Sequence, residues 1–315
     1  MKSYTTKEVC NISGLDRTTI FRWEEEKVIL APERDRHNHR KYSEEILQEI
    51  MRLSGKNRHE IYAIVNQKGG VGKTTITINI AACLAKCNQK VLVMDLDSQS
   101  SLTYGFGLTI GAAEKNTYHL LTDDNVSVAD IVKPTSFSSL SVAPANIILA
   151  NADFDLRQIV MGETILKTKL EEARKDYNYI LIDCPPNLGP TVGAGVLAAD
   201  AIIVPIQLQE FSLIGLQQLM IFLKLIFKRT KNKVNVYLLP NMVDNRFSLA
   251  NNLLEELKKN FEGKILPQIN TCVTIADSQH YRQPIITYNN SCRGAKDFKK
   301  LTDYIMKEVK PAVPS

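Results

Sequence analysis

The sequence predicts an α/β protein whose main part is a doubly wound, mostly parallel sheet, preceded by a small, mainly helical domain. From about residue 60 onward, continuous apolar runs of strand length alternate with stretches long enough for crossover helices. This pattern is typical of parallel strands that are covered on both faces. The first 60 residues show only short helices and turns, and residues 54–58 (SGKNR) are polar like a linker. We therefore expect two domains, residues 1–57 and 58–315.

Length and composition indicate a soluble, folded chain. Its 315 residues are 44% hydrophobic and 23% charged, which argues against disorder. The N-terminal residues lack a signal-peptide core, and no stretch reaches about 18 apolar residues, so we expect a cytoplasmic protein without a membrane span. The six cysteines are scattered without a C-x-x-C pair, which favours reduced thiols and no zinc site. The net charge of +5 is compatible with a polyanionic partner but does not identify one.

Residues 4–50 are expected to form a helix, a turn, a second helix, a hairpin and a third helix. Thr5 or Thr6 can cap the first helix, and Asp16 can cap the second after a glycine turn. Phe21 and Trp23 on the second helix are expected in the core. The exposed start of this helix would present Arg17, Thr18, Thr19 and Arg22. The hairpin carries a focused basic charge from Arg34, Arg36, Arg40 and Lys41.

Five apolar runs are expected to form the strands of the large sheet. In chain order they are IYAIV (61–65), KVLVMD (90–95), YILID (179–183), AIIVPI (201–206) and NVYLLP (235–240). In such sheets a ligand binds at the carboxyl ends of the strands. The first run ends at a glycine-rich loop, so this loop lies where a ligand is expected.

The glycine-rich loop GGVGKTT (residues 69–75) follows a strand and opens a helix, which is the setting of a phosphate-binding loop. Its glycines let backbone N–H groups approach phosphate oxygens, and the helix N-terminus attracts negative charge. Lys73 would reach the β and γ phosphates of ATP, and the Thr74 hydroxyl would bind Mg²⁺. The expected nucleotide-binding residues are Gly69, Gly70, Val71, Gly72, Lys73, Thr74 and Thr75.

Residues 68–75 (KGGVGKTT) resemble the deviant Walker A motif of the ParA/MinD family of ATPases, which position plasmids, chromosomes and division sites. Residues 91–101 (VLVMDLDSQSS) look like the second motif of the family, and residues 179–189 (YILIDCPPNLG) look like its Walker B segment. Residues 204–219, 239–248 and 275–298 resemble later blocks. The resemblance therefore covers most of the chain after residue 60.

The resemblance implies a homodimer that forms with ATP, in which Lys68 crosses the interface to the partner's nucleotide. There its ammonium would stabilise charge on the transferring phosphoryl group. Lys68, Lys73 and Asp97 would be the catalytic residues, with Asp97 orienting the attacking water. The implied reaction is Mg²⁺-dependent ATP hydrolysis with a weak basal rate.

The same resemblance implies further contacts to the metal and the base. Asp95 and Asp183 would lie near the Mg²⁺ with Thr74, and Asn241 occupies a position that contacts adenine in relatives. Ser98 and Ser100 stand where the family usually has proline and glycine, so the geometry of this loop and the hydrolysis rate are left open.

The N-terminal residues 4–50 resemble the winged helix-turn-helix domain of the MerR family. That resemblance implies that the second helix reads the major groove and that the hairpin, or wing, contacts phosphates. The expected DNA contacts are Arg17, Thr18, Arg22, Arg34, Arg36, Arg40 and Lys41. A protein-contact module is the alternative for a small helical domain.

The sequence is compatible with three functions. The first is a partition or positioning ATPase, associated with the nucleoid or a plasmid, that binds a specific DNA site, acts with a ParB-like or adaptor protein and represses its own operon. The second is a transcription regulator for which ATP is an allosteric ligand. The third is a MinD-like protein on a membrane surface, but residues 296–315 look more like a helix packed on the sheet. Arg246 is a candidate for non-specific DNA contact, although residues 270–274 lack the basic residues of relatives.

Overall fold

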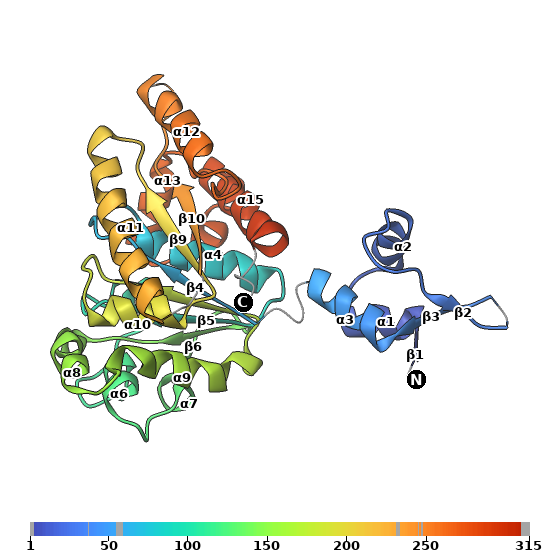
Figure 1. The fold of residues 1–315 in the computed structure, drawn as a ribbon, viewed down its shortest axis with the longest axis horizontal. Helices are drawn as coiled ribbons and strands as arrows, with labels where there is room; N and C mark the ends of the chain where they lie inside the picture. The colour runs from blue at the N-terminus through green and yellow to red at the C-terminus, as the bar shows by residue number, and fades with distance from the viewer. Residues whose placement is uncertain are drawn as a thin grey trace. The chain divides into compact units, whose positions relative to one another are not determined.

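The computed structural model of the chain describes residues 3–36, 38–54, 59–230, 234–244, 246 and 248–309. The chain divides into two units, Met1–His59 and Glu60–Ser315 (Figure 1). The predicted domain boundary between residues 57 and 58 lies outside the described residues. Within those residues, every helix is too short or too polar to cross a bilayer.

The first unit pairs a helix-turn-helix with a small antiparallel sheet of order β1-β3-β2. Its helices are α1 (Thr6–Ser13), α2 (Arg17–Glu25) and α3 (Glu44–Leu53), and its strands are β1 (Ser3–Thr5), β2 (Glu33–Arg34) and β3 (Arg40–Ser43). The predicted order of helices and hairpin is confirmed. Strand β1 was not predicted, and it pairs with β3 along its whole length.

Side-chain caps fix the ends of the first two helices. Thr5 caps α1 in a capping box with Glu8, and Gly14 ends the helix with a left-handed φ of 70°. Asp16 then caps α2 by accepting a 2.8 Å hydrogen bond from the backbone N–H of Thr19. The tight spacing of these caps makes the turn between the helices short, as a helix-turn-helix requires.

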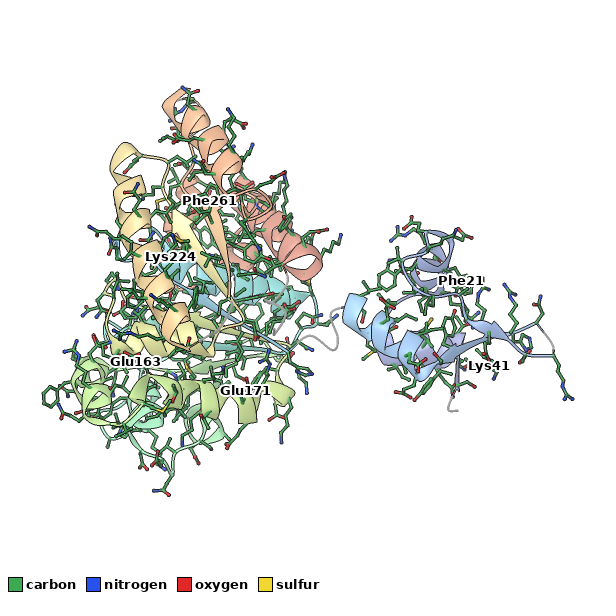
Figure 2. The ribbon with its side chains drawn as sticks, in the orientation of Figure 1. Phe21, Lys41, Glu163, Glu171, Lys224 and Phe261 are labelled. Carbon is green, nitrogen blue, oxygen red and sulfur yellow. The ribbon has the colours of Figure 1, made fainter. Side chains whose placement is uncertain are left out.

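The core of the first unit includes Val9, Ile20, Tyr42 and Ile50, each with 0% exposure. Phe21 (Figure 2) and Trp23 pack against this core and are partly buried, as predicted. These aromatic rings therefore stabilise the helix pair by burying apolar surface.

The second unit is built on a seven-stranded sheet of order β10-β9-β4-β8-β5-β7-β6. All strand pairs are parallel except β6 with β7. The five predicted strands are present as β4 (Glu60–Ile64), β5 (Val91–Asp95), β8 (Tyr179–Asp183), β9 (Ala201–Ile206) and β10 (Asn235–Pro240). Strands β6 (Lys133–Pro134) and β7 (Leu140–Ala143) were not predicted and extend one edge.

Helices cover both faces of this sheet, so its central strands are buried on both sides. Residues of β4 alternate between two cores: Ile61 and Ala63 face one cluster, whereas Tyr62 and Ile64 face the other. This explains why the strand reads as a continuous apolar run. The helices α4 (Lys73–Lys86) and α15 (Arg293–Glu308) lie on the second face. Residues Phe298, Leu301 and Ile305 of α15 are buried there, so the expected packing of the C-terminal helix is confirmed.

The remaining elements connect the strands or cover one of the two faces. They are α5 (Ser101–Gly105), α6 (Thr117–Thr122), α7 (Val128–Ile131), η1 (Ile147–Asn151), α8 (Ala152–Gln158), η2 (Gly162–Thr164), α9 (Ile165–Ala173), η3 (Arg174–Asp176), α10 (Pro190–Ala198), α11 (Glu210–Thr230), α12 (Ser248–Asn260), α13 (Val273–His280) and α14 (Ile285–Tyr288). Helix α14, for example, packs on the second face through Ile285 and Ile286.

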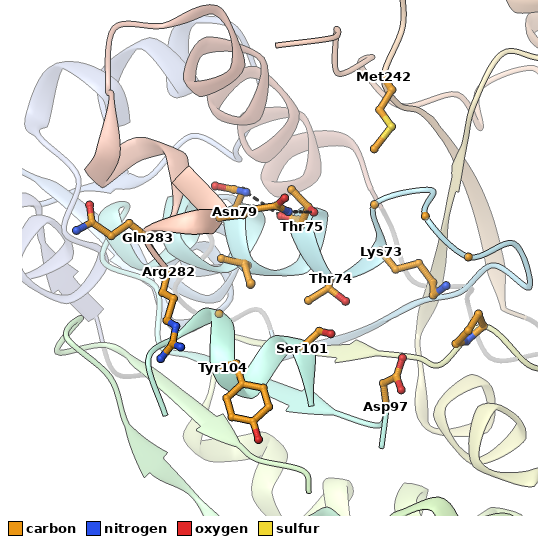
Figure 3. Close-up of a pocket in the computed structure, with 17 residues that line it drawn as sticks. Lys73, Thr74, Thr75, Asn79, Asp97, Ser101, Tyr104, Met242, Arg282 and Gln283 are labelled. Carbon is orange, nitrogen blue, oxygen red and sulfur yellow. Dashed lines mark hydrogen bonds between the residues drawn. The ribbon is translucent and has the colours of Figure 1, made fainter. Parts of the chain in front are cut away.

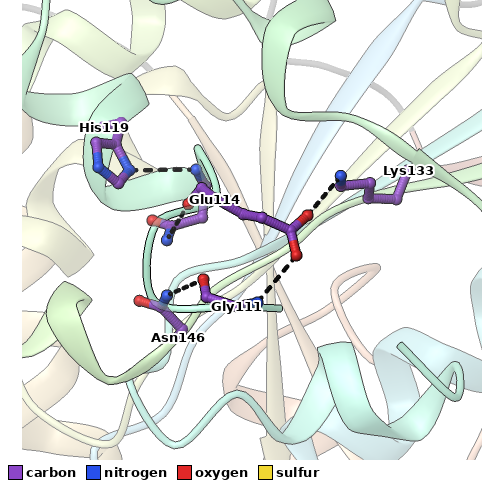
Figure 4. Close-up of polar contacts among 6 residues, drawn as sticks. Gly111, Glu114, His119, Lys133 and Asn146 are labelled. Carbon is purple, nitrogen blue, oxygen red and sulfur yellow. Dashed lines mark hydrogen bonds and ion pairs between the residues drawn. The ribbon is translucent and has the colours of Figure 1, made fainter. Parts of the chain in front are cut away.

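The segment between α5 and α6 is fixed to the sheet edge by Glu114. One of its carboxylate oxygens accepts a 3.0 Å hydrogen bond from the backbone N–H of Gly111, and the other pairs with Lys133 of β6 at 2.8 Å (Figure 4). Both side chains of the ion pair are solvent-accessible, so we assign it a modest contribution to stability.

Candidate functional site

The glycine-rich loop lies between the end of β4 and the start of α4. Gly70 and Gly72 adopt left-handed φ values of 74° and 89°, which favour glycine. A Cβ atom on Gly72 would also lie 2.5 Å from Nδ2 of Asn241. That same Nδ2 donates a 2.8 Å hydrogen bond to the carbonyl of Val71. Asn241, the residue after β10, therefore holds the backbone of the loop.

A cavity of about 590 Å³ opens beside this loop. Its volume lies in the range of sites for nucleotide-sized ligands, roughly 300–1,000 Å³. Figure 3 shows it running along the N-terminal part of α4. The lining residues are Gly69, Gly70, Gly72, Lys73, Thr74, Thr75, Ile78, Asn79, Asp97, Ser101, Tyr104, Gly105, Pro186, Met242, Gln279, Arg282 and Gln283.

Lys73 is the first residue of α4, and only 8% of it is exposed. Its ammonium donates a hydrogen bond of 3.4 Å to the carbonyl of Lys68. Burial lowers the pKa of Lys73, and the nearby carboxylate of Asp183 opposes that shift. A desolvated cation at a helix N-terminus is well placed to bind an anionic group.

Asp183 ends β8 and contacts the first turn of α4. Its Oδ2 accepts a 2.6 Å hydrogen bond from Thr74 Oγ1, and its Oδ1 accepts a 3.2 Å bond from Thr77 Oγ1. Burial, together with the charge of Asp95, raises the pKa of Asp183 to about 7. The strand end and the loop therefore share one polar network.

The oxygen atoms of Thr74 and Asp183 are the type of ligand that Mg²⁺ prefers. Among the described residues, no group of three or more His, Cys, Asp or Glu side chains could hold a metal ion. Mg²⁺ commonly keeps several waters and is shared between one or two protein oxygens and substrate phosphates. The Thr74 and Asp183 pair fits that mode of binding.

Asp95 is fully buried and holds the loop that carries Asp97. Its Oδ2 accepts hydrogen bonds from the backbone N–H and the hydroxyl of Thr103 at 2.9 and 2.7 Å. Its Oδ1 accepts a 3.1 Å bond from the backbone N–H of Asp97. Burial raises the pKa of Asp95 to about 6. These contacts use both oxygens of Asp95 to fix the loop, and Asp97 lines the cavity with Lys73 (Figure 3).

Lys68 lies outside the cavity lining in this single chain. Its ammonium donates hydrogen bonds of 3.2 Å to the side-chain oxygens of Gln207 and Gln209. Both acceptors are neutral amides, which stabilise a cation less than a phosphate does. The side chain therefore has weak local partners that an anionic ligand could replace.

Several residues that line the cavity were not predicted from the sequence. Gln279 donates a hydrogen bond to the hydroxyl of Thr75, and Asn79 Oδ1 accepts a 2.7 Å bond from the backbone N–H of Ile285. Arg282 adopts a left-handed φ of 52°, which is strained for a non-glycine residue. Residues 275–298 resembled a family block, but no local pattern indicated which side chains face the nucleotide. The missed lining residues with polar or aromatic groups are Asn79, Ser101, Tyr104, Gln279, Arg282 and Gln283.

The predicted DNA contacts in the first unit lie on α2 and the wing. Arg17, Thr18 and Arg22 are exposed on α2. In the wing, Arg34 and Arg36 are exposed and Lys41 is partly buried, while Arg34 also bonds Asn38 Oδ1 at 3.1 Å. These cations are accessible to a polyanion, as recognition of DNA requires.

Arg40 differs from the other wing cations because it is bound inside the first unit. Its Nε donates a 2.7 Å hydrogen bond to Glu24 Oε2, and its guanidinium lies 3.9 Å from the centre of the Phe21 ring. The other oxygen of Glu24 accepts a 2.5 Å bond from the hydroxyl of Tyr42. Arg40 thus joins the wing to α2 through an ion pair and a cation–π contact.

Arg246 lies in the second unit, where its side chain is 85% exposed. Its Nε donates a 2.9 Å hydrogen bond to Asp244 Oδ1. The positive charge of Arg246 is therefore largely balanced by a neighbour two residues away.

Comparison with known protein families gives two matches. Residues 59–236 match the family described as "AAA domain", and residues 4–54 match "MerR HTH family regulatory protein". The chain is 38% identical over 244 residues to the sporulation initiation inhibitor protein Soj of Bacillus subtilis, covering 77% of this chain and 96% of that protein. It is 33% identical over 251 residues to the chromosome partitioning protein ParA of Caulobacter vibrioides, covering 78% and 93%.

Two solved structures with bound nucleotide analogues share the fold. A putative plasmid partition protein of Borrelia burgdorferi bound to AMPPNP has a TM-score of 0.69 and 25% identity, covering 79% of this chain and 99% of that chain. Cobyrinic acid a,c-diamide synthase of Mycobacterium smegmatis, with an ATP analogue and magnesium, has a TM-score of 0.67 and 27% identity, covering 78% and 94%.

Proposed function

Because this chain belongs to the ParA/Soj family of ATPases, we propose that it hydrolyses ATP with Mg²⁺ to position or partition DNA, and that its N-terminal domain binds a specific DNA site. One observation carries the proposal for the second unit. A single cavity is lined by Lys73, Thr74 and Asp97, and Asp183 bonds Thr74 at its edge. The analogues bound to the Borrelia and Mycobacterium proteins support ATP as the ligand.

Each residue of the cavity has a distinct task in this proposal. The backbone N–H groups of residues 69–75 and the ammonium of Lys73 bind the phosphates. Thr74 and Asp183 hold the Mg²⁺, which neutralises phosphate charge when it is bound. Asn241 contacts adenine through Oδ1, because its Nδ2 is bonded to Val71.

Asp97 orients the attacking water. Its Oδ1 accepts a 2.9 Å hydrogen bond from the backbone N–H of Gln99, so Oδ2 is the oxygen that we assign to the water. The bond from the Asp97 N–H to Asp95 fixes the position of this carboxylate before the substrate binds. We propose that Asp95 acts near the metal site in this way, by holding the loop. Such prior positioning lowers the reorganisation needed during reaction.

The proposal includes a homodimer that forms with ATP, in which Lys68 exchanges Gln207 and Gln209 for the partner's phosphates. Large exposed apolar side chains on the second unit support a protein contact. They belong to η1, α8 and the turn before η2. Their exposed fractions are 71% for Ile147, 65% for Phe154, 91% for Val160 and 72% for Met161.

For the first unit, we propose that α2 reads base edges and that the wing binds phosphates. The exposure of Arg17, Thr18 and Arg22 on one short helix, followed by a basic wing, supports this assignment. The expected polymer partner is DNA, and the expected protein partner is a ParB-like or adaptor protein that stimulates hydrolysis. Self-repression of the operon would follow if the DNA site lies in its own promoter.

The test is phosphate release from ATP by the full chain, measured alone, with DNA and with candidate centromere-binding proteins. We expect slow turnover alone and faster turnover with the partner and DNA together. Asp97→Ala should slow turnover strongly, whereas Lys86→Ala, at the far end of α4, should retain it. ATP binding without turnover under every condition would instead identify ATP as an allosteric ligand of a transcription regulator.

A further inference from the structure

Asp153 on α8 holds the loop that follows Asp183, residues 184–189. Its Oδ1 accepts hydrogen bonds from the backbone N–H and the hydroxyl of Thr191, at 2.8 and 2.6 Å. Its Oδ2 accepts a 3.3 Å bond from Nδ2 of Asn187. One carboxylate thus binds residues on both sides of Gly189: Asn187 in the loop and Thr191 in α10.

This carboxylate replaces a local cap on α10. Gly189 is the N-cap residue of α10 and has no side chain to bond the free N–H groups of the first turn. Asp153 supplies that acceptor from a different helix, and its negative charge interacts favourably with the N-terminus of α10. The start of α10 therefore depends on a residue 38 positions earlier in the chain.

The carboxylate of Asp153 packs directly against the backbone of Gly189. A Cβ atom at this position would lie 2.2 Å from Oδ2 of Asp153. The backbone of Gly189 has a φ of -89° and a ψ of -179°, which any residue can adopt. Glycine is needed there because Asp153 approaches the backbone. Substitution of Gly189 by alanine therefore tests the contact.

The loop held by Asp153 borders the nucleotide cavity. It follows Asp183, which bonds Thr74, and its Pro186 lines the cavity together with Lys73 and Asp97. We expect a shift of this loop to change the cavity near Asp97, where the terminal phosphate is expected, more than it changes the glycine-rich loop. In the proposed function the glycine-rich loop binds the phosphates. Small misplacements of groups near reacting atoms can cost roughly 100-fold in rate.

We propose that Asp153 is a positioning residue for hydrolysis: it fixes the loop after Asp183 so that the cavity is shaped for reaction, without contributing to nucleotide binding. The kinetic part of this inference rests on the proposed ATPase function. In the proposed function, Lys73 and the backbone of residues 69–75 bind the phosphates, and none of these residues belongs to the loop. Affinity and turnover should therefore separate in variants of Asp153.

The kinetic test compares Asp153→Ala with Asp155→Ala on the same helix. Asp155 is the matched control, because its carboxylate bonds the hydroxyl of Tyr118 at 2.9 Å and does not contact the loop. In Asp153→Ala we expect kcat to fall roughly 10- to 100-fold, because groups near the reacting atoms would be misplaced, while ADP affinity stays within about twofold of wild type. Asp155→Ala should retain both values. Equal losses of kcat and ADP affinity in Asp153→Ala would overturn the proposal.

A second pair of variants tests the contact itself. Gly189→Ala should lower kcat with Asp153 intact, because the new methyl group displaces the carboxylate. In the double variant, Gly189→Ala should add no further loss to Asp153→Ala, since the group it displaces is gone. Additive losses would show that Gly189 and Asp153 act separately, which contradicts the proposed contact.

Hydrogen exchange of the amide of Thr191 tests the same contact without turnover. We expect faster exchange at Thr191 in Asp153→Ala and wild-type exchange in Asp155→Ala. Unchanged exchange in Asp153→Ala would overturn the positioning role. If the wild-type chain binds ATP but never hydrolyses it, the proposed function fails, while the exchange at Thr191 still decides whether Asp153 holds the loop.

Discussion

The hydroxyl of Thr74 donates a 2.6 Å hydrogen bond to Oδ2 of Asp183, although the two residues are 109 positions apart in the chain. The bond joins the first turn of α4 to the end of β8, beside the ammonium of Lys73. Because the carboxylate is buried, this contact gives a hydrogen-bond partner to an oxygen that is shielded from water. Two oxygen ligands suited to Mg²⁺ are therefore held together before nucleotide binds.

Replacement of Lys73 by alanine should abolish ATP binding. The substitution removes a buried cation at the N-terminus of α4, where the β and γ phosphates are expected. Titration with a fluorescent ATP analogue measures this, and Lys86→Ala on the same helix is the control. Wild-type affinity in Lys73→Ala would mean that the phosphates bind elsewhere.

Replacement of Asp97 by alanine should leave ATP affinity unchanged and slow hydrolysis strongly. Its carboxylate lines the cavity but is assigned to water rather than to nucleotide. An ATP-bound dimer should accumulate, which sizing chromatography detects. Asp97→Ala that releases phosphate at the wild-type rate would exclude Asp97 as the residue that orients water.

Replacement of Lys68 by alanine should remove both hydrolysis and ATP-dependent dimerisation. In the single chain the ammonium of Lys68 bonds the neutral side chains of Gln207 and Gln209, so loss of this side chain should not disturb the fold. Lys90→Ala, at the residue before β5, is the control lysine. If sizing chromatography with ATP shows Lys68→Ala dimerising as well as wild type, Lys68 does not act across the interface.

The central strands could be predicted from the sequence because burial on both faces leaves a continuous apolar run. Strand β7 escaped prediction because it has only four residues and contains Ser141 among apolar neighbours. Strand β6 is a two-residue edge strand that ends in Pro134. Such short edges are set by the packing of the sheet rather than by a local pattern.

The residues of the site also fall into two groups: those that belong to a local sequence motif and those that only the fold brings together. Lys73 and Thr74 belong to one contiguous loop, so their role in phosphate binding can be predicted from the sequence motif. Gln279, Arg282 and Asp153 come from segments far from this loop, and their side-chain types are common on any surface. Only the fold brings them to the cavity or to the loop after Asp183.

The wing arginines should differ in their effect on the salt dependence of DNA binding. Arg36 is exposed, so Arg36→Ala should reduce the slope of log affinity against log salt by about 1, as loss of one phosphate contact does. Arg40 is bound to Glu24 and Phe21, so Arg40→Ala should weaken binding by freeing the wing and leave the slope unchanged. Anisotropy titrations at several salt concentrations measure both. An equal drop in slope for Arg40→Ala would place Arg40 on a phosphate.

The two units have a short connection that bears on how DNA binding is controlled. Helix α3 ends at Leu53 and β4 begins at Glu60, which leaves no room for the long dimerisation helix that follows the wing in MerR-like regulators. We therefore propose that dimerisation of the ATPase domain replaces it. ATP would then bring two winged domains onto one duplex, and bivalent binding can raise affinity by roughly 10²–10⁴.

The most direct test of this coupling is an anisotropy titration of the full chain on an inverted-repeat DNA site and on its half-site, with ATP, with ADP and without nucleotide. A site selected from random duplexes by the wild-type chain with ATP serves as the probe. We predict much tighter binding to the full site with ATP than with ADP, no such difference on the half-site, and loss of the ATP advantage in Lys68→Ala. Equal affinity for the full site with ATP, with ADP and without nucleotide would contradict the account, because the winged domain would then bind DNA without control by the nucleotide.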